Sequence, residues 1–447
     1  MIIGRGFAAC DDGTGAQTGT DAGTSAVRCN DLPNPIYLQI GDTQEPHIKD
    51  LGKRLRDTTV PGQQMTVVYV TTGSCTNIEA TYTDIKISVN PKYIPSAQEM
   101  PGWNPQMASP TCTIDPAGKD IDIANSALLN DACTKDPAPA SIGLFQGANQ
   151  AYLFVVPEAS SQKALTAEEA YFVFGFGAAG MAQPWTDEML YFIRTTTKST
   201  LVALAANIAV PAAKWKGRRL DQSTEVVNGV ASSVNPEKTI GILGAEIYET
   251  GRDKLNALAF QAYKQTKAYY PDSTAAARDK RNMRDGHYTT WSPTVYMTKV
   301  GSDGMPTNPR AKLLIDLILA KPVTPAPGFD PLEIVISKGL VPQCAMKVAR
   351  QAEGGPLSSF APAEPCHCYY EQKATGTAPA GCKVCTTDDV CGTGKCHHGF
   401  CEAVGSASAP ATHEQIVNAP TAADVEAIEK KPTLPLVETD GALPPLP

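Results

Sequence analysis

The grouping of the cysteines constrains the fold of this 447-residue chain more than any other feature. Eight of its thirteen cysteines lie between Cys344 and Cys401, and four more are dispersed between Cys29 and Cys133. Cys10 stands outside these two even sets. A short segment so rich in cysteine cannot build a large core, so crosslinks must hold it together. We therefore expect a disulfide-rich module near the C-terminus of a larger body.

Two kinds of site could use the C-terminal cysteines. Cys382 and Cys385 form a C-x-x-C pair with histidines close by, as in zinc sites. The alternative is a knot of disulfides, which persists in the oxidising compartments that exported proteins reach. We favour disulfides, because no second C-x-x-C pair lies at zinc-ribbon spacing. The disulfide candidates are Cys29, Cys75, Cys112, Cys133, Cys344, Cys366, Cys368, Cys382, Cys385, Cys391, Cys396 and Cys401. No metal site is expected.

The N-terminus carries part of an export signal. Phe7-Ala8-Ala9-Cys10 is similar to a bacterial lipobox, which makes Cys10 the lipidation candidate, although few residues precede it. Residues 11–25 are rich in Gly, Thr and Asp, as in a flexible tether. The sequence has no run of about 20 apolar residues, the length that a membrane span requires. We expect a periplasmic or cell-surface protein that contacts a membrane only through a lipid on Cys10.

Length and charge limit the classes of function. A chain of 447 residues exceeds the usual size of a single core, so two lobes are expected. The net charge of −8 and the lack of clustered Lys and Arg argue against nucleic acid as a partner. An acidic protein can still bind a small anion where local dipoles and one or two cations attract it.

Strand and helix patterns alternate from residue 36 to residue 320. Residues 36–40, 65–70 and 150–157 are apolar enough for buried strands, and residues 48–55 have helical spacing. A strand, a helix and a second strand form a βαβ unit, whose parallel strands bring their loops to one edge of a sheet. The pattern therefore predicts an α/β fold.

The same alternation continues into the second half of the chain. Thr166 and Glu169 match a capping-box pair, which predicts the start of a helix, and the apolar residues 239–244 predict a strand. The apolar spacing from Leu255 to Tyr263 predicts another helix. The expected segments are a tether with a lipobox at 1–33, lobe 1 at 34–140, lobe 2 at 141–284, a return to lobe 1 at 285–340, a cysteine-rich module at 341–402 and a Pro/Ala-rich tail at 403–447.

Hydroxyl-rich loops lie next to three of the predicted elements. Gly41-Asp42-Thr43-Gln44 and residues 71–76 follow the first two strands, and residues 195–200 precede an apolar helix. Such loops would meet at one cleft, where helix N–H groups and hydroxyls attract an oxyanion. The planar guanidinium of Arg194 would add several N–H donors in a fixed geometry. The alternative is that these hydroxyls only cap a helix and that Arg194 is a surface residue.

The order of these segments resembles the phosphate-type periplasmic substrate-binding proteins that feed ABC importers. The resemblance covers about residues 35–320, and its motifs are Gly41-Asp42-Thr43-Gln44, Thr72-Gly73-Ser74, Asp122-Ile123-Ala124-Asn125-Ser126, Arg194 through Thr200, Ile240-Gly241-Ile242-Leu243-Gly244 and Asp285-Gly286-His287-Tyr288. It implies a two-lobed periplasmic-binding-protein-like α/β fold, with mixed sheets flanked by helices and a small oxyanion held between the lobes. The ligand contacts that it implies are Thr43, Gln44, Ser74, Ser126, Arg194, Ser199 and Thr200.

The sequence departs from the family pattern at two places. The family's Gly-Ser-Gly-Thr turn is replaced by Thr197-Lys198-Ser199-Thr200, and the loss of both glycines restricts how closely the backbone can surround an anion. Ala127 stands where the family has an acidic acceptor. Lys198 could compensate with its charge, or the site could have turned to another solute or to none.

These observations lead to one main hypothesis and two alternatives. We expect an exported solute-binding protein that captures a phosphate-like oxyanion for an ABC importer, with no catalytic residue and no cofactor. The first alternative is a cell-surface or scaffold protein that has lost its ligand and binds another envelope protein through the cysteine-rich module. An enzyme is the second, with His287 as a base and Ser273 or Ser292 as a nucleophile, but the sequence has no Gly-x-Ser-x-Gly elbow.

Overall fold

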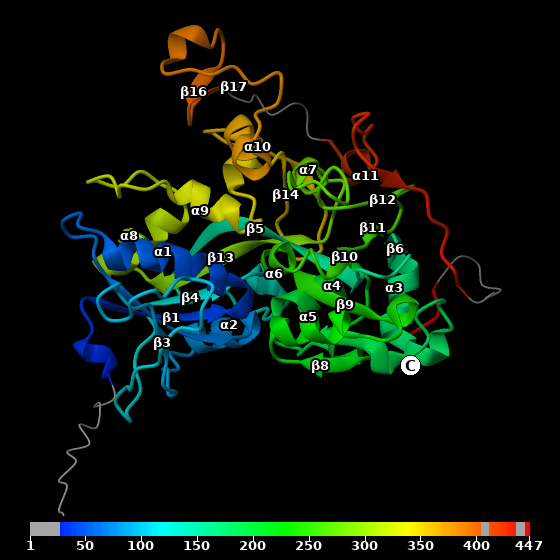
Figure 1. Cartoon of the computed structure of the whole chain (residues 1–447), viewed down its shortest axis with the longest axis horizontal. Helices are drawn as coiled ribbons and strands as arrows, with labels where there is room; N and C mark the ends of the chain where they lie inside the picture. The colour runs from blue at the N-terminus through cyan, green and yellow to red at the C-terminus, as the bar shows by residue number, and fades with distance from the viewer. Residues whose placement is uncertain (1–26, 404–410, 435–442) are drawn as a thin grey trace, which may run out of the picture.

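One ten-stranded sheet runs through both halves of the molecule, in the order β3-β2-β1-β4-β13-β5-β9-β7-β8, with β10 paired to β5. The computed structural model describes residues 27–403, 411–434 and 443–447. We call the part built on β1–β4, α1 and α2 lobe 1, and the part built on β6–β12 and α3–α6 lobe 2 (Figure 1). Lobe 1 contains β1 (Pro35–Gly41), β2 (Thr66–Thr72), β3 (Lys92–Tyr93), β4 (Ile123–Ser126), α1 (Glu45–Asp57) and α2 (Ser74–Tyr82). Lobe 2 contains β6 (Ala164–Thr166), β7 (Tyr191–Arg194), β8 (Arg218–Leu220), β9 (Ile240–Gly244), β10 (Leu255–Ala257), β11 (Ala259–Gln261), β12 (Ala268–Tyr269), α3 (Ala167–Phe176), α4 (Ser199–Asn207), α5 (Ser223–Ala231) and α6 (Ala245–Thr250).

Each lobe is built on three parallel strands in the same arrangement. In lobe 1 the central strand β1 pairs with β2 and β4, and in lobe 2 the central strand β7 pairs with β8 and β9. An antiparallel strand completes each set, β13 beside β4 and β5 beside β9. The loops after β1 and β7 leave the carboxyl ends of their strands, which is where α/β sheets bind ligands.

Two long strands connect the lobes. β5 (Ile142–Pro157) pairs with β13 (Trp291–Lys299) over its first part and with β9 and β10 over its last part. The strand β5 therefore belongs to both lobes. Any hinge movement must bend this strand or the β13 strand beside it.

Separate apolar clusters fill the two lobes. In lobe 1 the buried side chains of β1 and β2 pack against α1 and against α8 (Pro309–Ile318). In lobe 2 a larger cluster joins β5, β7 and β9 to α3, α4 and α5. The burial of both faces explains why the strand sequences are continuous apolar runs instead of alternating patterns.

Six disulfides join the twelve predicted cysteines. The pairs are Cys29–Cys112, Cys75–Cys133, Cys344–Cys366, Cys368–Cys382, Cys385–Cys396 and Cys391–Cys401. The disulfide interpretation is therefore confirmed, as is the two-lobed α/β fold with a disulfide-rich module. The lipidation candidate Cys10 lies outside the described residues.

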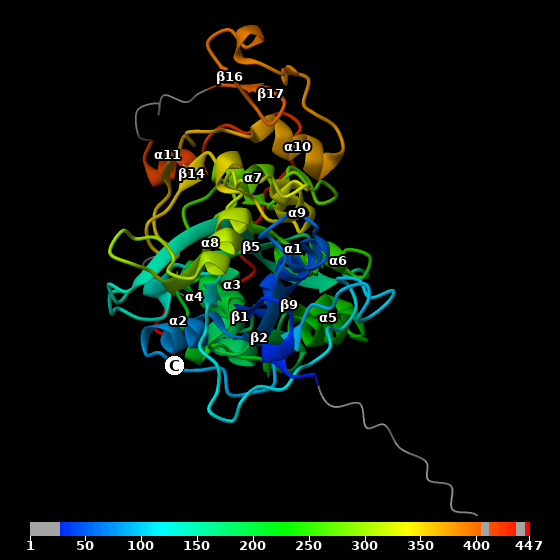
Figure 2. The same cartoon turned by 90° about the vertical axis from the view of Figure 1, so that its left-hand side faces the viewer.

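The C-terminal part of the chain contacts both lobes. It contains α9 (Pro331–Ser337), β14 (Val348–Ala349), β15 (Ser358–Ser359), α10 (His367–Thr375), β16 (Lys395–His397), β17 (Phe400–Glu402), α11 (His413–Val417) and β18 (Ala427–Ile428). The β16–β17 hairpin projects from the body in both views, above α10 (Figures 1 and 2). The chain then returns to lobe 2, where β18 pairs with β12 and Tyr171 of α3 donates a hydrogen bond to the carbonyl of Pro444.

One expected helix is wrong. Residues 255–257 form β10 and residues 259–261 form β11 instead, because β10 pairs with the end of β5 and β11 pairs with β6. Strand pairing with distant segments overrides the local spacing. Among the described residues, no helix combines the length and the apolar character needed to cross a membrane.

The Cys29–Cys112 bridge closes a long loop of lobe 1, with a sequence separation of 83 residues. The double variant Cys29→Ala/Cys112→Ala should lower the free energy of unfolding by about 2–4 kcal/mol, because the unfolded chain gains freedom. Urea unfolding followed by tryptophan fluorescence measures the change. The matched control Cys368→Ala/Cys382→Ala lies in the module and should leave the unfolding of the lobes unchanged.

His47 of α1 makes the protein sensitive to acid. Burial, aided by the charge of Lys338, lowers the pKa of this imidazole to about 4. Because the unfolded chain takes up a proton near pH 6.5 and the folded chain does not, stability is lost as the pH falls from about 6.5 to about 4. The loss from this residue should reach about 3 kcal/mol. In His47→Gln that part of the pH dependence should disappear from urea unfolding measured at pH 7 and pH 4.5.

Candidate functional site

A buried ion pair joins the two lobes at the carboxyl ends of their central strands. Arg194 is the last residue of β7, and Asp42 opens the short helix η2 (Asp42–Gln44) after β1. Nη2 of Arg194 lies 2.9 Å from Oδ2 and 3.1 Å from Oδ1 of Asp42. The two residues are only 0% and 8% exposed. One nitrogen of the guanidinium thus contacts both oxygens of a carboxylate from the other lobe.

Lobe 2 surrounds the Asp42 carboxylate with further donors. The backbone N–H and the hydroxyl of Ser223 donate to Oδ2 over 3.0 and 2.9 Å, and Nζ of Lys198 lies 4.0 Å from Oδ1. Ser223 is the first residue of α5, whose N-terminus favours negative charge. Burial raises the pKa of Asp42, but the charges of Arg194 and Lys198 together with these hydrogen bonds bring it below its usual value. Asp42 is therefore ionised at neutral pH.

The remaining donors of Arg194 bind lobe 2 itself. Nε donates to the carbonyl of Leu220 over 3.3 Å, Nη1 donates to the hydroxyl of Ser223, and Nη2 also donates to the carbonyl of Asp221 over 2.6 Å. Every nitrogen of the guanidinium has a protein partner. The two oxygens of Asp42 stand where the oxygens of a bound oxyanion could receive the same donors.

Direct backbone contacts close the gap between the lobes beside this pair. The N–H of Cys75 in lobe 1 donates to the carbonyl of Thr197 in lobe 2 over 3.2 Å, and Nζ of Lys198 lies 3.4 Å from the carbonyl of Thr72. A Cβ on Gly73 would stand 2.6 Å from the oxygen of Thr197. Only glycine permits this approach of the two loops.

The seven predicted ligand contacts are all buried at the junction of the lobes. Thr43 and Gln44 lie in η2, Ser74 opens α2, Ser126 ends β4, Arg194 ends β7, and Ser199 and Thr200 open α4. Several of them bind their own lobe. The hydroxyl of Ser74 accepts from the N–H of Ala127 over 3.0 Å, and the hydroxyl of Ser126 donates to the carbonyl of Leu128 over 3.0 Å. Oγ1 of Thr200 has no hydrogen-bond partner among the described residues.

A second polar group links the lobes behind Asp42. Nε2 of Gln44 donates to Oε1 of Glu246 over 2.7 Å and to Oε1 of Gln150 over 2.9 Å. Glu246 lies on α6 and Gln150 on β5, so these bonds join lobe 1 to lobe 2 and to the shared strand. Burial raises the pKa of Glu246 well above its usual value, which favours the protonated form of its carboxyl.

The acidic member of the ion pair and its neighbours were not among the predicted ligand contacts. Asp42 stood in a motif that resembles a binding loop, but only the next two residues were selected as contacts. An acidic residue directly after a buried strand was the available signal for a partner of Arg194. Ser223 had a weaker signal, the capping box between Gln222 and Glu225 that opens α5. Glu246 had none, because its partners lie far away in the sequence.

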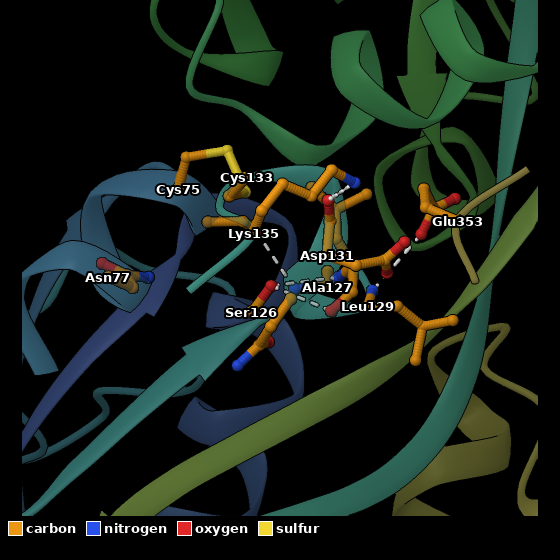
Figure 3. Close-up of a disulfide and its surroundings, with 12 residues drawn as sticks. Cys75, Asn77, Ser126, Ala127, Leu129, Asp131, Cys133, Lys135 and Glu353 are labelled. Carbon is orange, nitrogen blue, oxygen red and sulfur yellow. Dashed lines mark hydrogen bonds between the residues drawn. A yellow bond between two sulfur atoms is a disulfide. The ribbon is translucent and has the colours of Figure 1, made fainter. Parts of the chain in front are cut away.

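Cavities lie on both sides of the junction. One of about 480 Å³ is bordered by Asp42, Ser223 and Glu246, and another of about 810 Å³ is bordered by the Cys75–Cys133 disulfide and by α4. Figure 3 shows the disulfide of the larger cavity with Glu353, whose carboxylate accepts from the N–H of Leu129 over 3.3 Å.

Comparisons with known proteins give matches at the level of structure alone. No protein-family model matches the sequence, and no curated protein is found as a relative. A substrate-binding protein with bound phosphate from Clostridium perfringens is 12% identical over 69% of this chain and 99% of its own, with a TM-score of 0.48. A phosphate transport receptor from Vibrio cholerae is 12% identical over 68% and 99%, with a TM-score of 0.43. PstS from Borrelia burgdorferi is 14% identical over 69% and 99%, with a TM-score of 0.38. These structures belong to the family that the sequence motifs resemble.

Gly73 offers a test of the closed arrangement. Gly73→Ala should lower the free energy of unfolding by about 1–3 kcal/mol, because the methyl group would overlap the Thr197 carbonyl. Small-angle scattering should also give a larger radius of gyration for the variant. The matched control is Gly41→Ala, where the nearest atoms to the added Cβ are 3.8 and 3.9 Å away, and it should change neither value. Equal effects of the two substitutions would contradict the contact.

Proposed function

We propose that this chain is an exported scaffold protein with a solute-binding fold, in which Asp42 serves as a built-in anion at the oxyanion position. The observation that carries the proposal is the contact of Nη2 of Arg194 with both carboxylate oxygens of Asp42, which joins the two lobes at their junction. In this hypothesis the body is a rigid support, and the cysteine-rich module binds a partner protein of the cell envelope.

A free oxyanion would have to compete with a tethered one. A group attached to the same chain acts at an effective concentration on the order of millimolar or more, provided that its geometry fits. Asp42 fits, since it receives donors from both Arg194 and Ser223. A free phosphate-like ion would bind only weakly against this competitor.

The C-terminal segment restrains the opening that solute capture requires. Glu353 binds the N–H of Leu129 in lobe 1 and accepts from the hydroxyl of Ser292 on β13 over 2.5 Å. A Cβ on the next residue, Gly354, would stand 2.9 Å from the Cβ of Ala206, which lies in α4 of lobe 2. Hinged binding proteins separate their lobes to exchange a ligand. This segment touches both sides of the gap and the connecting strand.

The disulfides and the module support the cellular part of the proposal. Six disulfides are typical of a protein that resides in an oxidising compartment, here the periplasm or the cell surface. The module projects from the body, and the side chain of Val384 on it is 71% exposed. A lipid on Cys10 would tether the chain to a membrane.

Capture of a small oxyanion for an ABC importer is the second candidate function. The observation that favours it is the cation Lys198 beside Arg194, together with the hydroxyl of Thr200 that lacks a partner among the described residues. In this candidate the ion displaces Asp42 when the lobes open. Thr43, Gln44, Ser74, Ser126, Arg194, Ser199 and Thr200 would be its contacts.

Calorimetric titration with phosphate and sulfate distinguishes the two functions. The unmodified protein should give no binding at 25 °C up to concentrations of about 1 mM. Asp42→Ala removes the internal competitor and should bind at least one of the two ions with a Kd of about 1 mM or lower. The double variant Asp42→Ala/Arg194→Met should lose that binding.

The control is Asp221→Ala, which removes an exposed carboxylate beside Lys198 and should behave as the unmodified protein does. Tight phosphate binding by the unmodified protein, in the micromolar range, would establish the second candidate. If neither the unmodified protein nor Asp42→Ala binds phosphate or sulfate, the hypothesis that Asp42 substitutes for an oxyanion is contradicted.

A further inference from the structure

We infer that the cavity of about 480 Å³ in front of Asp42 binds a small organic carboxylate, whose acid group pairs with Lys49 and whose hydroxyl or oxo group binds Glu246. The cavity lies between the lobes, at the first turns of α1, α5 and α6, which stand together at the junction in Figure 1. Its volume suits a small molecule. The site does not include Arg194, so this inference is independent of what occupies the oxyanion position.

Glu246 gives the cavity a buried group that still needs a partner. The residue is 1% exposed, and it borders the cavity. Its Oε1 accepts from Gln44, whereas its Oε2 has no hydrogen-bond partner among the described residues. Buried polar atoms are rarely left without a hydrogen bond, so an atom of this kind that borders a cavity indicates a ligand or an ordered water.

The free oxygen of Glu246 is the place for a proton on this carboxyl. Burial raises the pKa of the carboxyl well above its usual value, which favours the protonated form. Oε1 already accepts from Gln44, so a proton on Glu246 would lie on Oε2. A donor without an acceptor favours a ligand oxygen such as a hydroxyl or a carbonyl.

Lys49 supplies a positive charge to the same cavity. This residue of α1 is buried, and its Nζ donates to the carbonyl of Met107 over 2.5 Å. No carboxylate lies within ion-pair distance of it in the part of the chain that the structure describes. An ammonium group has three donors, so two remain for a ligand. The other cations bordering the cavity are already paired, Lys338 with Asp50 and Arg278 with Glu249.

The acidic residues that border the cavity do not repel an anion, because cations outside the cavity neutralise them. Asp42 pairs with Arg194, and Glu45 lies 3.1 Å from Nζ of Lys92. Glu249 binds Lys280 and Arg252 at 2.6 and 2.8 Å. Apolar side chains form part of the wall, from Pro46, Pro105, Met107, Ala108 and Ile247, beside uncharged polar residues such as Gln222 and Thr224. A short carbon skeleton with a carboxylate at one end fits these surroundings.

The test measures binding of L-lactate, L-malate and pyruvate to the full chain by calorimetry and thermal unfolding. At least one of the three should raise the unfolding temperature by about 2 °C or more at 10 mM. Lys49→Met should weaken the binding of that probe about tenfold or more. Lys53→Met, one turn further along α1 and outside the cavity, is the matched control and should keep the Kd within about twofold.

Two variants of Glu246 examine the other end of the site. Glu246→Gln should retain binding, because its amide nitrogen replaces the protonated oxygen as donor, whereas Glu246→Ala should lose about tenfold or more. The folded state of each variant is checked by its thermal transition. Absence of a response to all three probes, or equal affinity of Lys49→Met and Lys53→Met, would overturn the inference. Neither result depends on phosphate or sulfate titration of Asp42→Ala, so the two proposals fail separately.

Discussion

A single buried pair of opposite charges, Asp42 with Arg194, determines how the two lobes meet. Each charge alone would be costly to bury, by several kcal/mol even after relaxation, so neither residue tolerates a dry environment without the other. Asp42 follows the central strand of lobe 1, and Arg194 ends the central strand of lobe 2. The ion pair therefore forms only when the carboxyl ends of β1 and β7 face each other. The hydroxyl of Ser223, the Cys75–Thr197 backbone bond and the contact at Gly73 all depend on that arrangement.

The shared strand β5 makes this arrangement reachable. Because β5 pairs with β13 at one end and with β9 at the other, the two lobes are parts of one sheet. Two sets of three parallel strands then oppose each other across the junction, as in a structure with approximate internal symmetry. The cavity at Lys49 and Glu246 is what remains open after the loops have met, and its walls come from α1 on one side and from α5 and α6 on the other.

The sequence predicted local features well and long-range partners poorly. The apolar runs near residues 36–40 and 65–70 correspond to β1 and β2, and the capping box of Thr166 and Glu169 is present at the start of α3. These features depend on residues close together in the chain. The helix expected over residues 255–263 is wrong because the strands there form with partners 95 to 102 residues away. Arg194 was predicted to be a ligand contact from its residue type, but its partner Asp42, 152 residues distant, could not be derived from spacing.

The path of the C-terminal chain gives the cysteine-rich module an attachment at two points. The chain leaves the body at α9 and α10 and forms the β16–β17 hairpin. It then returns to lobe 2, where β18 is the edge strand of a four-stranded sheet in the order β18-β12-β11-β6. A module attached at one end can rotate relative to the body, whereas a module attached at both ends passes an applied force to both attachment sites. A protein that pulled on the hairpin would therefore stress the β12–β18 edge of lobe 2 as well as the α9 side near lobe 1. The module is thus inserted between two segments of the chain that both pack against the body, α9 before it and β18 after it.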